Sequence, residues 1–343
     1  KVDEINAAGG LKVGADIYNN IKVVSYDHKA RADEATTVAK RLVFQDQVKY
    51  ILGNNVGATQ AAAQLVTEPN KVFFSFGAWG KELLGTSKPY SFRNYVSTWE
   101  IADPFYEWVH KNFPEVKTLA ILDPNDTSGW DSAKGGMTAA EKLGIKTVAE
   151  VYYERGTSDF GPFVTKILAA KPDMVDFSGS PPGDAALVAK GLHERGYKGV
   201  KIFLAGIDPK PFMDIAGSAA DETHMALGWD LQGNYARPAL KTLTEKYNAK
   251  YPAEPLTTVG LANYAIGGVV FETMSKIAST DVDKVIQAIG VPGKQFDTVM
   301  GPITLGGKET YGIDRQFLHP FVISVIRSGK LIDLEEIKPI GLR

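Results

Sequence analysis

The chain has 343 residues, which is long for one hydrophobic core, so two domains are expected. With 38 basic and 40 acidic residues its net charge is −2, which gives no electrostatic reason to expect a nucleic acid as partner. It has no cysteine, which excludes disulfides, cysteine-ligated zinc, iron–sulfur clusters and a thiol nucleophile. No run of apolar residues approaches the roughly 20 that a membrane-spanning helix needs.

The first part of the chain predicts a helix, a strand and a second helix. A short helix over residues 2–8 ends at Gly9-Gly10, which is a common helix C-cap signal. Residues 21–26 read as a strand, and residues 32–44 as an amphipathic helix. Because the chain opens on what reads as the tail of a helix, we expect a further segment upstream of the sequence given.

The stretch from residue 50 to residue 83 predicts the feature around which the chain is organised. Residues 50–52 read as a strand, 57–66 as a helix, and 72–76 as a strand buried on both faces of a parallel sheet. Two loops bounded by glycine follow these strands, one with Asn54 and Asn55 and the other with Trp79. Ligands bind at the carboxyl edge of open α/β sheets, so we expect these loops to hold a small molecule.

The same alternation of strand and helix returns further along the chain. An extended piece at 91–95 and a helix at 99–112 precede a second block, with strands predicted over 118–122, 147–153, 174–178, 201–206 and 224–229 and helices between them. Helices over 236–250, 259–277 and 281–289 follow, and then a tail of strands from residue 298 with a hairpin turn at Ser328-Gly329.

This order predicts an α/β protein with two doubly wound, Rossmann-like lobes. Lobe 1 is expected to contain residues 1–117 and 236–318, and lobe 2 to contain residues 118–235 and 319–343. Such a division makes the chain cross several times between the lobes. We therefore expect a hinge with several crossings and a ligand cleft between the lobes.

Several segments resemble the leucine/isoleucine/valine-binding family of type I periplasmic solute receptors. They include INAAGGL near the start and VFFSFGAWGKEL at residues 72–83. They also include TLAILDPNDTSGWDSAKGG in the second block and TTVGLANYAIGGV, which begins just before the helix predicted over 259–277. The resemblance covers nearly the whole chain in order. One departure is that the family begins with a strand and loop before the first helix, and that N-terminal strand is missing from the sequence given.

The resemblance implies a receptor of an ABC importer, with no catalysis, cofactor or metal. Such a receptor captures a small solute, an amino acid or a small organic carboxylate, by lobe closure and presents it to a membrane permease. The resemblance also implies a monomer in the periplasm, or one held outside the cell by a lipid anchor in a Gram-positive source. Carried over by position, and joined by aromatic residues placed near the cleft, the expected ligand contacts are Asn54, Asn55, Gly77, Ala78, Trp79, Tyr95, Ser128, Trp130, Ser180, Asp208 and Trp229.

The residue types at these positions leave the ligand class open. The helix that begins after Asn55 offers backbone N–H groups to a carboxylate, and Asp208 is either the partner of a ligand ammonium or a turn residue before Pro209. The indoles of Trp79, Trp130 and Trp229 favour an aromatic or other flat carboxylate, although each could instead pack structurally. We interpret Arg93 as a structural residue rather than a ligand for an anion.

Other function classes have less support. No strand is followed by the glycine pattern of a dinucleotide site, and the five histidines are scattered without the spacing of a metal site. Two alternatives to the importer receptor remain open at this point. One is a ligand-sensing domain of the same fold, and the other is an α/β enzyme, which would chemically change its tightest ligand.

Overall fold

The computed structural model describes residues 1–29, 31–53, 57–77, 80–204, 209–227, 237–254 and 256–342. The chain divides into two compact units, which are described separately. The first unit contains residues 1–95 and 259–318, and the second contains residues 96–258 and 319–343. The chain therefore passes between the units three times, at Tyr95, Thr258 and Leu318.

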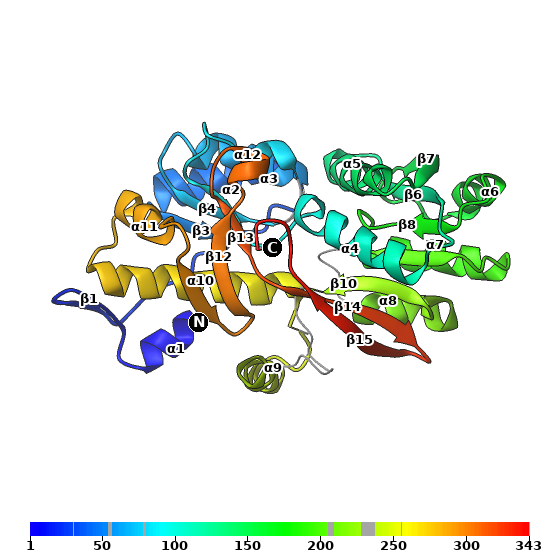
Figure 1. The fold of residues 1–343 in the computed structure, drawn as a ribbon. Coiled ribbons are helices and arrows are strands. Elements are labelled where there is room, and N and C mark those ends of the chain that lie inside the picture. Colours follow the sequence, from blue (N-terminus) through cyan, green and yellow to red (C-terminus); the bar gives the residue numbers. More distant parts are fainter. Residues whose placement is uncertain are drawn as a thin grey trace. The chain divides into compact units, whose positions relative to one another are not determined.

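The first unit is built on a six-stranded sheet with the strand order β11-β12-β13-β5-β4-β3 (Figure 1). Strands β3, β4, β5 and β13 run parallel, and β12 runs antiparallel to both β11 and β13. The strands of this unit are β1 (Leu11–Val13), β2 (Asp16–Tyr18), β3 (Tyr50–Leu52), β4 (Phe73–Phe76), β5 (Ser91–Arg93), β11 (Gln295–Thr298), β12 (Gly301–Gly306) and β13 (Gln316–Leu318). Its helices are α1 (Val2–Ala7), α2 (Ala32–Lys40), η1 (Arg41–Gln45), α3 (Gly57–Thr67), η2 (Lys81–Leu83), α10 (Thr258–Ile277), α11 (Val282–Ile289) and α12 (Lys308–Tyr311).

Strand β4 lies in the interior of this sheet, as its apolar run predicts. All four of its residues are buried, and the Phe73 ring stacks on the Phe92 ring of β5 with 4.4 Å between ring centroids. On the other side of the strand, Phe74 and Phe76 pack with Val66 of α3 and Leu83 of η2 in one hydrophobic cluster. A strand covered on both faces needs apolar residues at successive positions, which is why this run could be recognised.

The expected strand over residues 21–26 is wrong. Among the described residues no strand pairs with this segment, and the side chains of Val23 and Val24 are 72% and 41% exposed. A strand is held by ladder hydrogen bonds to a neighbour, so an apolar alternation without a partner does not form one. The sequence also did not reveal the small antiparallel pair β1–β2 or the change from α-helix to π-helix at Arg41.

The second unit is built on a seven-stranded sheet with the order β15-β14-β10-β9-β8-β6-β7 (Figure 1). The five strands from β10 to β7 run parallel, and β14 and β15 form an antiparallel hairpin at one side. The strands are β6 (Thr118–Pro124), β7 (Lys146–Tyr153), β8 (Met174–Asp176), β9 (Val200–Phe203), β10 (Thr223–Leu227), β14 (Phe321–Arg327) and β15 (Lys330–Ile337). The helices are α4 (Thr98–Asn112), α5 (Thr127–Lys142), α6 (Gly161–Ala169), α7 (Pro182–Glu194), α8 (Pro209–Ala216), η3 (Gly217–Ala220) and α9 (Pro238–Lys250).

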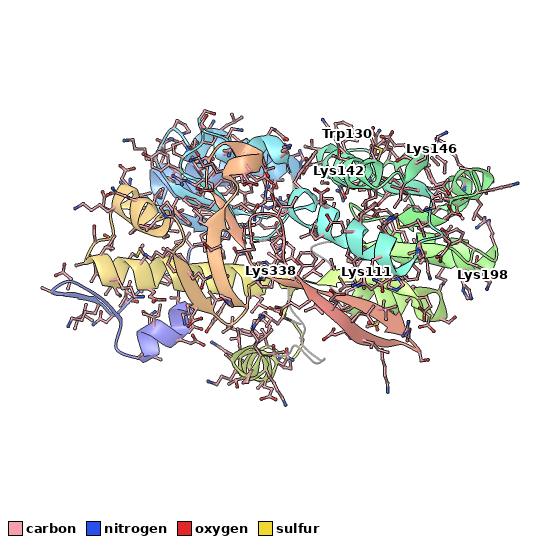
Figure 2. All side chains as sticks on the ribbon, viewed as in Figure 1. Lys111, Trp130, Lys142, Lys146, Lys198 and Lys338 are labelled. Atoms are coloured by element: carbon pink, nitrogen blue, oxygen red, sulfur yellow. The ribbon has the colours of Figure 1, made fainter. Side chains whose placement is uncertain are left out.

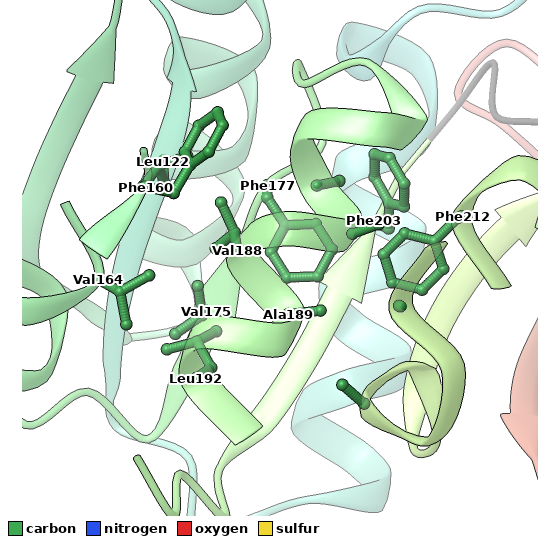
Figure 3. Packing of buried hydrophobic residues seen from close by; sticks show 14 of the residues in the cluster. Leu122, Phe160, Val164, Val175, Phe177, Val188, Ala189, Leu192, Phe203 and Phe212 are labelled. Atoms are coloured by element: carbon green, nitrogen blue, oxygen red, sulfur yellow. The ribbon is translucent and has the colours of Figure 1, made fainter. Parts of the chain in front are cut away.

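The core of the second unit lies between the parallel strands and helices α6, α7 and α8. Phe177, Phe203 and Phe212 are fully buried and meet there with ring centroids 5.2 to 6.1 Å apart (Figure 3). At the far end of the sheet, the predicted hairpin turn is confirmed, because Arg327 pairs with Lys330 and both Ser328 and Gly329 have positive φ angles.

The two units differ from the expected lobes in two segments. Helices α4 and α9 belong to the second unit, although both were expected in lobe 1. Helix α4 packs against α5, because Gly135 and Gly136 lack side chains where Thr98 and Tyr106 approach (Figure 1). The Tyr106 hydroxyl also donates to Asp176 of β8 at 2.6 Å, so α4 is tied to the second sheet.

Candidate functional site

The second sheet has a topological switch point at strands β6 and β8. The chain runs from β6 to its neighbour β7 on one side and then returns to β8 on the other side of β6. The loops that follow β6 and β8 therefore separate in opposite directions at the carboxyl edge. Open α/β sheets bind ligands at such a point.

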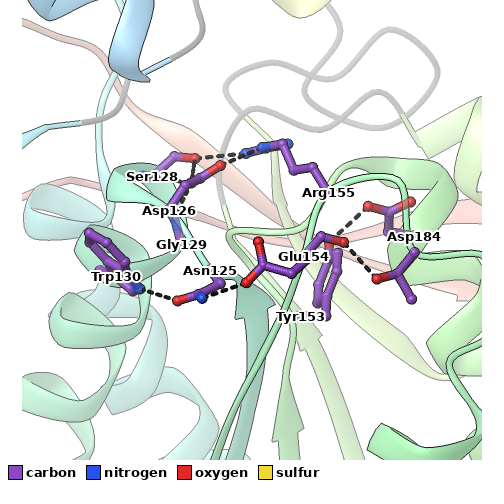
Figure 4. A network of polar contacts seen from close by, with 10 residues as sticks. Asn125, Asp126, Ser128, Gly129, Trp130, Tyr153, Glu154, Arg155 and Asp184 are labelled. Atoms are coloured by element: carbon purple, nitrogen blue, oxygen red, sulfur yellow. Dashed lines mark hydrogen bonds and ion pairs between the residues drawn. The ribbon is translucent and has the colours of Figure 1, made fainter.

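Helix α5 begins directly after β6 with a network of polar contacts (Figure 4). Asp126 caps the helix, because its Oδ1 accepts hydrogen bonds from the backbone N–H groups of Ser128 at 2.9 Å and Gly129 at 3.2 Å. The Ser128 hydroxyl donates to the same oxygen at 2.5 Å. Arg155, which follows β7, forms an ion pair with Asp126 and donates from Nη2 to the Ser128 hydroxyl at 2.8 Å.

This network sets the charge state of Asp126. Burial opposes ionisation of the carboxyl, but the hydrogen bonds from Arg155 and Ser128 outweigh it and hold the pKa of Asp126 below its usual range. Asp126 therefore favours its ionised form, which pairs with Arg155.

The indole of Trp130 lies on the surface of the second unit (Figure 2). The side chain is half exposed, and its Nε1–H donates to the Asn125 side-chain carbonyl at 3.1 Å. The Asn125 amide in turn donates to Glu154 at 2.7 Å (Figure 4). The ring is therefore held at one edge while its faces remain available for contact with a flat apolar group.

The loop after β8 is held by two buried carboxyl groups. The backbone N–H and the hydroxyl of Ser178 both donate to Asp176, and the Gly179 N–H donates to Asp123 of β6 at 2.7 Å. Ser180 is 5% exposed, and its hydroxyl donates to the backbone carbonyl of Leu122 at 3.1 Å. The loop that carries Ser180 is therefore fastened to β6 by side chain and main chain together.

The pKa values of the two carboxyl groups are both raised by burial. Burial raises the pKa of Asp123 well above its usual range, and the nearby Asp176 raises it further. Burial also raises the pKa of Asp176, although the hydrogen bonds from Ser178 and Tyr106 oppose the shift. Burial therefore favours the protonated form of Asp123 most strongly, and its carboxyl still accepts the Gly179 N–H.

The carboxyl edge of the first sheet is described in part. Gly53 and Gly77 end β3 and β4, and the Asn94 backbone N–H beyond β5 donates to the Phe76 carbonyl at 2.8 Å. The Asn94 side chain is 1% exposed and donates to Asn263 of α10 at 2.7 Å, while its own Oδ1 is buried and has no partner among the described residues. Asn94 and Asn263 were not expected from the sequence at this edge.

Arg93 lies in the interior of the first unit, in agreement with its structural interpretation. It is fully buried and donates to the Tyr311 hydroxyl at 2.7 Å and to the Gly80 carbonyl at 2.6 Å. The Tyr95 side chain, which follows two positions later, is 4% exposed, and its backbone carbonyl accepts from Gln316 at 2.9 Å.

The expected ligand contacts fall into three groups. Ser128 and Trp130 follow β6 and Ser180 follows β8, the two strands at the switch point of the second sheet, while Gly77 and Tyr95 follow β4 and β5 of the first. The others, which lie outside the described residues, are Asn54, Asn55, Ala78, Trp79, Asp208 and Trp229. The sequence missed the role of Asp126 and Arg155 in the network, although both directly follow strands that were predicted.

Two α/β units with polar loops at the carboxyl edges of parallel strands define the class of type I periplasmic solute-binding proteins. The family model described as periplasmic binding protein matches residues 1–330, and the chain belongs to this family. The resemblance to the leucine/isoleucine/valine-binding receptors is thereby confirmed. The family and fold are those of solute-binding proteins, which are not enzymes.

Similar proteins are found among both sequences and structures. The Leu/Ile/Val-binding protein homolog 8 of Brucella abortus is 26% identical over 332 residues, covering 92% of this chain and 78% of that protein. The substrate-binding protein LivJ of Streptococcus pneumoniae, solved with isoleucine, has a TM-score of 0.82 at 21% identity, with 98% of this chain and 92% of that chain covered. A solute-binding protein of an ABC transporter from Rhodopseudomonas palustris, solved with 3,4-dihydroxybenzoic acid, has a TM-score of 0.79 at 21% identity, covering 98% and 91%.

None of the helices in the described ranges combines the length and the apolar character that crossing a membrane requires.

Proposed function

We propose that this protein is an extracytoplasmic receptor of an ABC importer that captures an amino acid or a small aromatic or aliphatic carboxylate. The observation that carries the proposal is the switch point of the second sheet, where Ser128 and Trp130 follow β6 and Ser180 follows the neighbouring parallel strand β8. Family membership supports a solute-binding role, and the amino-acid and benzoate-type ligands of similar proteins suggest the range of candidates.

An aromatic solute is favoured by the state of the Trp130 side chain. A half-exposed indole whose N–H is already bonded offers flat apolar area and no competing donor. The remaining expected contacts, including Asn54, Trp79 and Asp208, stay part of the proposal. So do a periplasmic location, a monomeric state, a permease partner and closure of the lobes on the solute.

A thermal-shift screen tests the proposal. Amino acids are compared with aromatic and aliphatic carboxylates, because a solute that binds the native state raises the melting temperature with its concentration. The best solute is then titrated against Trp130→Ala, which we expect to weaken binding, and against Phe44→Ala as a control. Phe44 is also an exposed aromatic residue, but it lies on η1 before the start of β3.

Two results would count against the proposal. No solute of these classes stabilising the protein would contradict the binding role. Chemical conversion of the best solute during incubation would instead favour an enzyme. If the solute binds but small-angle scattering shows no compaction, lobe closure is wrong while the receptor role remains.

A further inference from the structure

Arg155 is held in a fixed position at the carboxyl edge of the second sheet. It occupies the second position of a tight turn directly after β7, closed by a hydrogen bond from the Thr157 N–H to the Glu154 carbonyl at 3.1 Å. Gly156 takes the third position with a φ of +88°, which is typical of a type II turn. The backbone of Arg155 is therefore set by local turn geometry.

The guanidinium of Arg155 is also fixed, but only along one of its edges. Nε donates to Asp126 and Nη2 donates to the Ser128 hydroxyl at 2.8 Å (Figure 4). A guanidinium has five N–H groups, so the edge formed by Nη1 and the second N–H of Nη2 is left over. Within the described ranges this edge has no protein partner, and the side chain is 43% exposed.

The hydroxyl groups nearby have already donated their hydrogens. Each serine hydroxyl has one hydrogen, and a carboxylate can only accept. The Ser128 hydrogen goes to Asp126 at 2.5 Å, and the Ser180 hydrogen goes to the Leu122 carbonyl at 3.1 Å. Of the side chains in this network at the start of α5, Ser128 has no hydrogen left, whereas Arg155 still has N–H groups to donate to an anion.

The charges around Arg155 are compatible with an anionic partner. Asp126 is paired with Arg155, and the start of the 16-residue helix α5 adds a partial positive charge. Glu154 turns to the Asn125 amide, whereas Arg155 turns to Ser128 (Figure 4). The free edge matches the two oxygens of a carboxylate, which arginine binds in a bidentate manner.

We propose that Arg155 is a specificity-determining residue that binds the carboxylate of the solute through its free edge. This inference rests on the proposed function and deepens it. The sequence alone favoured the helix after Asn55 for the carboxylate, and the proposal moves this contact to the second unit. Asp126 and Ser128 act as positioning residues, because they orient the guanidinium without consuming the free edge.

Matched acid and amide probes test the assignment. Isothermal titration is carried out with isoleucine and isoleucinamide, and with 3,4-dihydroxybenzoate and 3,4-dihydroxybenzamide. We expect Arg155→Gln to weaken binding of the acids by ~10- to 100-fold, as for the loss of hydrogen bonds to a charged group, and to leave the amides unchanged. Arg155→Lys should retain part of the affinity, because it keeps the charge but not the fork.

Arg327→Gln is the matched control. Arg327 forms a similarly exposed ion pair with Glu222, but it ends β14, which runs antiparallel to β10 and so reaches the opposite edge of the same sheet. Equal affinity of wild type and Arg155→Gln for an acid would refute the inference and leave the proposed function intact. An equal loss for acid and amide would also refute it, and melting curves would show whether the fold was damaged. If the wild-type protein binds neither acid more tightly than its amide, the inference is overturned, whereas the proposed function fails only if no solute of the thermal-shift screen binds.

Discussion

Replacing Asp123 by asparagine should make the second unit less sensitive to rising pH. Because burial raises the pKa of Asp123, the folded protein keeps this proton at pH values where the unfolded chain, with a pKa of about 3.9, has released it. A proton that is bound in the folded state but not in the unfolded state lowers the free energy of unfolding by about 1.4 kcal/mol for each pH unit, until the pH reaches the folded pKa. Asparagine carries no such proton, but its carbonyl can still accept the Gly179 N–H.

The free energy of unfolding of Asp123→Asn, measured relative to that of the wild type, should therefore increase as the pH rises. The change should be measurable between pH 5 and pH 7, because the raised pKa of Asp123 keeps its proton on the folded protein over a wider range than on the unfolded chain. Urea denaturation at several pH values measures it. Asp173→Asn serves as the control, because hydrogen bonds from the Lys117 and Thr118 backbones lower the pKa of Asp173 and its contribution should be constant above pH 5. A difference between Asp123→Asn and wild type that does not change with pH would refute the reasoning.

Three further predictions concern the same unit. Tyr106→Phe removes the hydroxyl that donates at 2.6 Å to the buried carboxyl of β8, so the free energy of unfolding should fall by about 1–3 kcal/mol, whereas Tyr26→Phe at an exposed hydrogen bond should change denaturation little. Gly129→Ala would place a Cβ 2.0 Å from the Pro124 carbonyl oxygen and should lower the melting temperature, whereas Gly183→Ala, with its nearest neighbour at 3.7 Å, should not. Burial lowers the pKa of His224 to about 4, so stability should be lost as the pH falls from 6.5 towards 4, by ~3 kcal/mol, and His224→Phe should remove this loss. Equal effects of a variant and its control, or an unchanged acid response in His224→Phe, would contradict these expectations.

The sheets could be predicted where a strand is buried on both faces. The runs at 72–76 and 118–122 have apolar residues at successive positions because neighbouring strands and helices cover them, and both segments are strands in the structure. The segment 21–26 has an apolar alternation that also fits a strand, but it has no partner strand among the described residues. The local pattern shows that a segment could form a strand, but whether it pairs with a neighbouring strand depends on residues elsewhere in the chain.

The placement of helix α4 could not be inferred from its own sequence. Its amphipathic pattern predicts a helix with one buried face, but not the sheet that the face covers. The determining contacts are the close approach of Thr98 to Gly135 and the hydrogen bond from Tyr106 to Asp176, which joins residues 70 positions apart. Such contacts between distant segments leave no periodic signal.

Single side chains of the candidate site could likewise be predicted only in part from the sequence. Ser128 and Ser180 could be placed at a carboxyl edge, because both follow predicted strands. Arg155 reads in the sequence as a charged loop residue, and only the parallel pairing of β6 with β7 brings it beside Asp126. Loops that follow adjacent parallel strands should therefore be read together.

The direction of each hydrogen bond at the switch point restricts what the site can recognise. Ser128 and Ser180 have donated their hydrogens to protein oxygens, so towards a solute they can act only as acceptors. Ser128 also accepts from Arg155. On the proposed assignment, a solute presents an acceptor to Arg155 and an N–H or O–H group to the serines. An α-amino acid and a hydroxylated benzoate both carry this combination, whereas an unsubstituted hydrocarbon acid carries only the first part, and the two kinds of acid should differ in their dependence on the Ser180 hydroxyl.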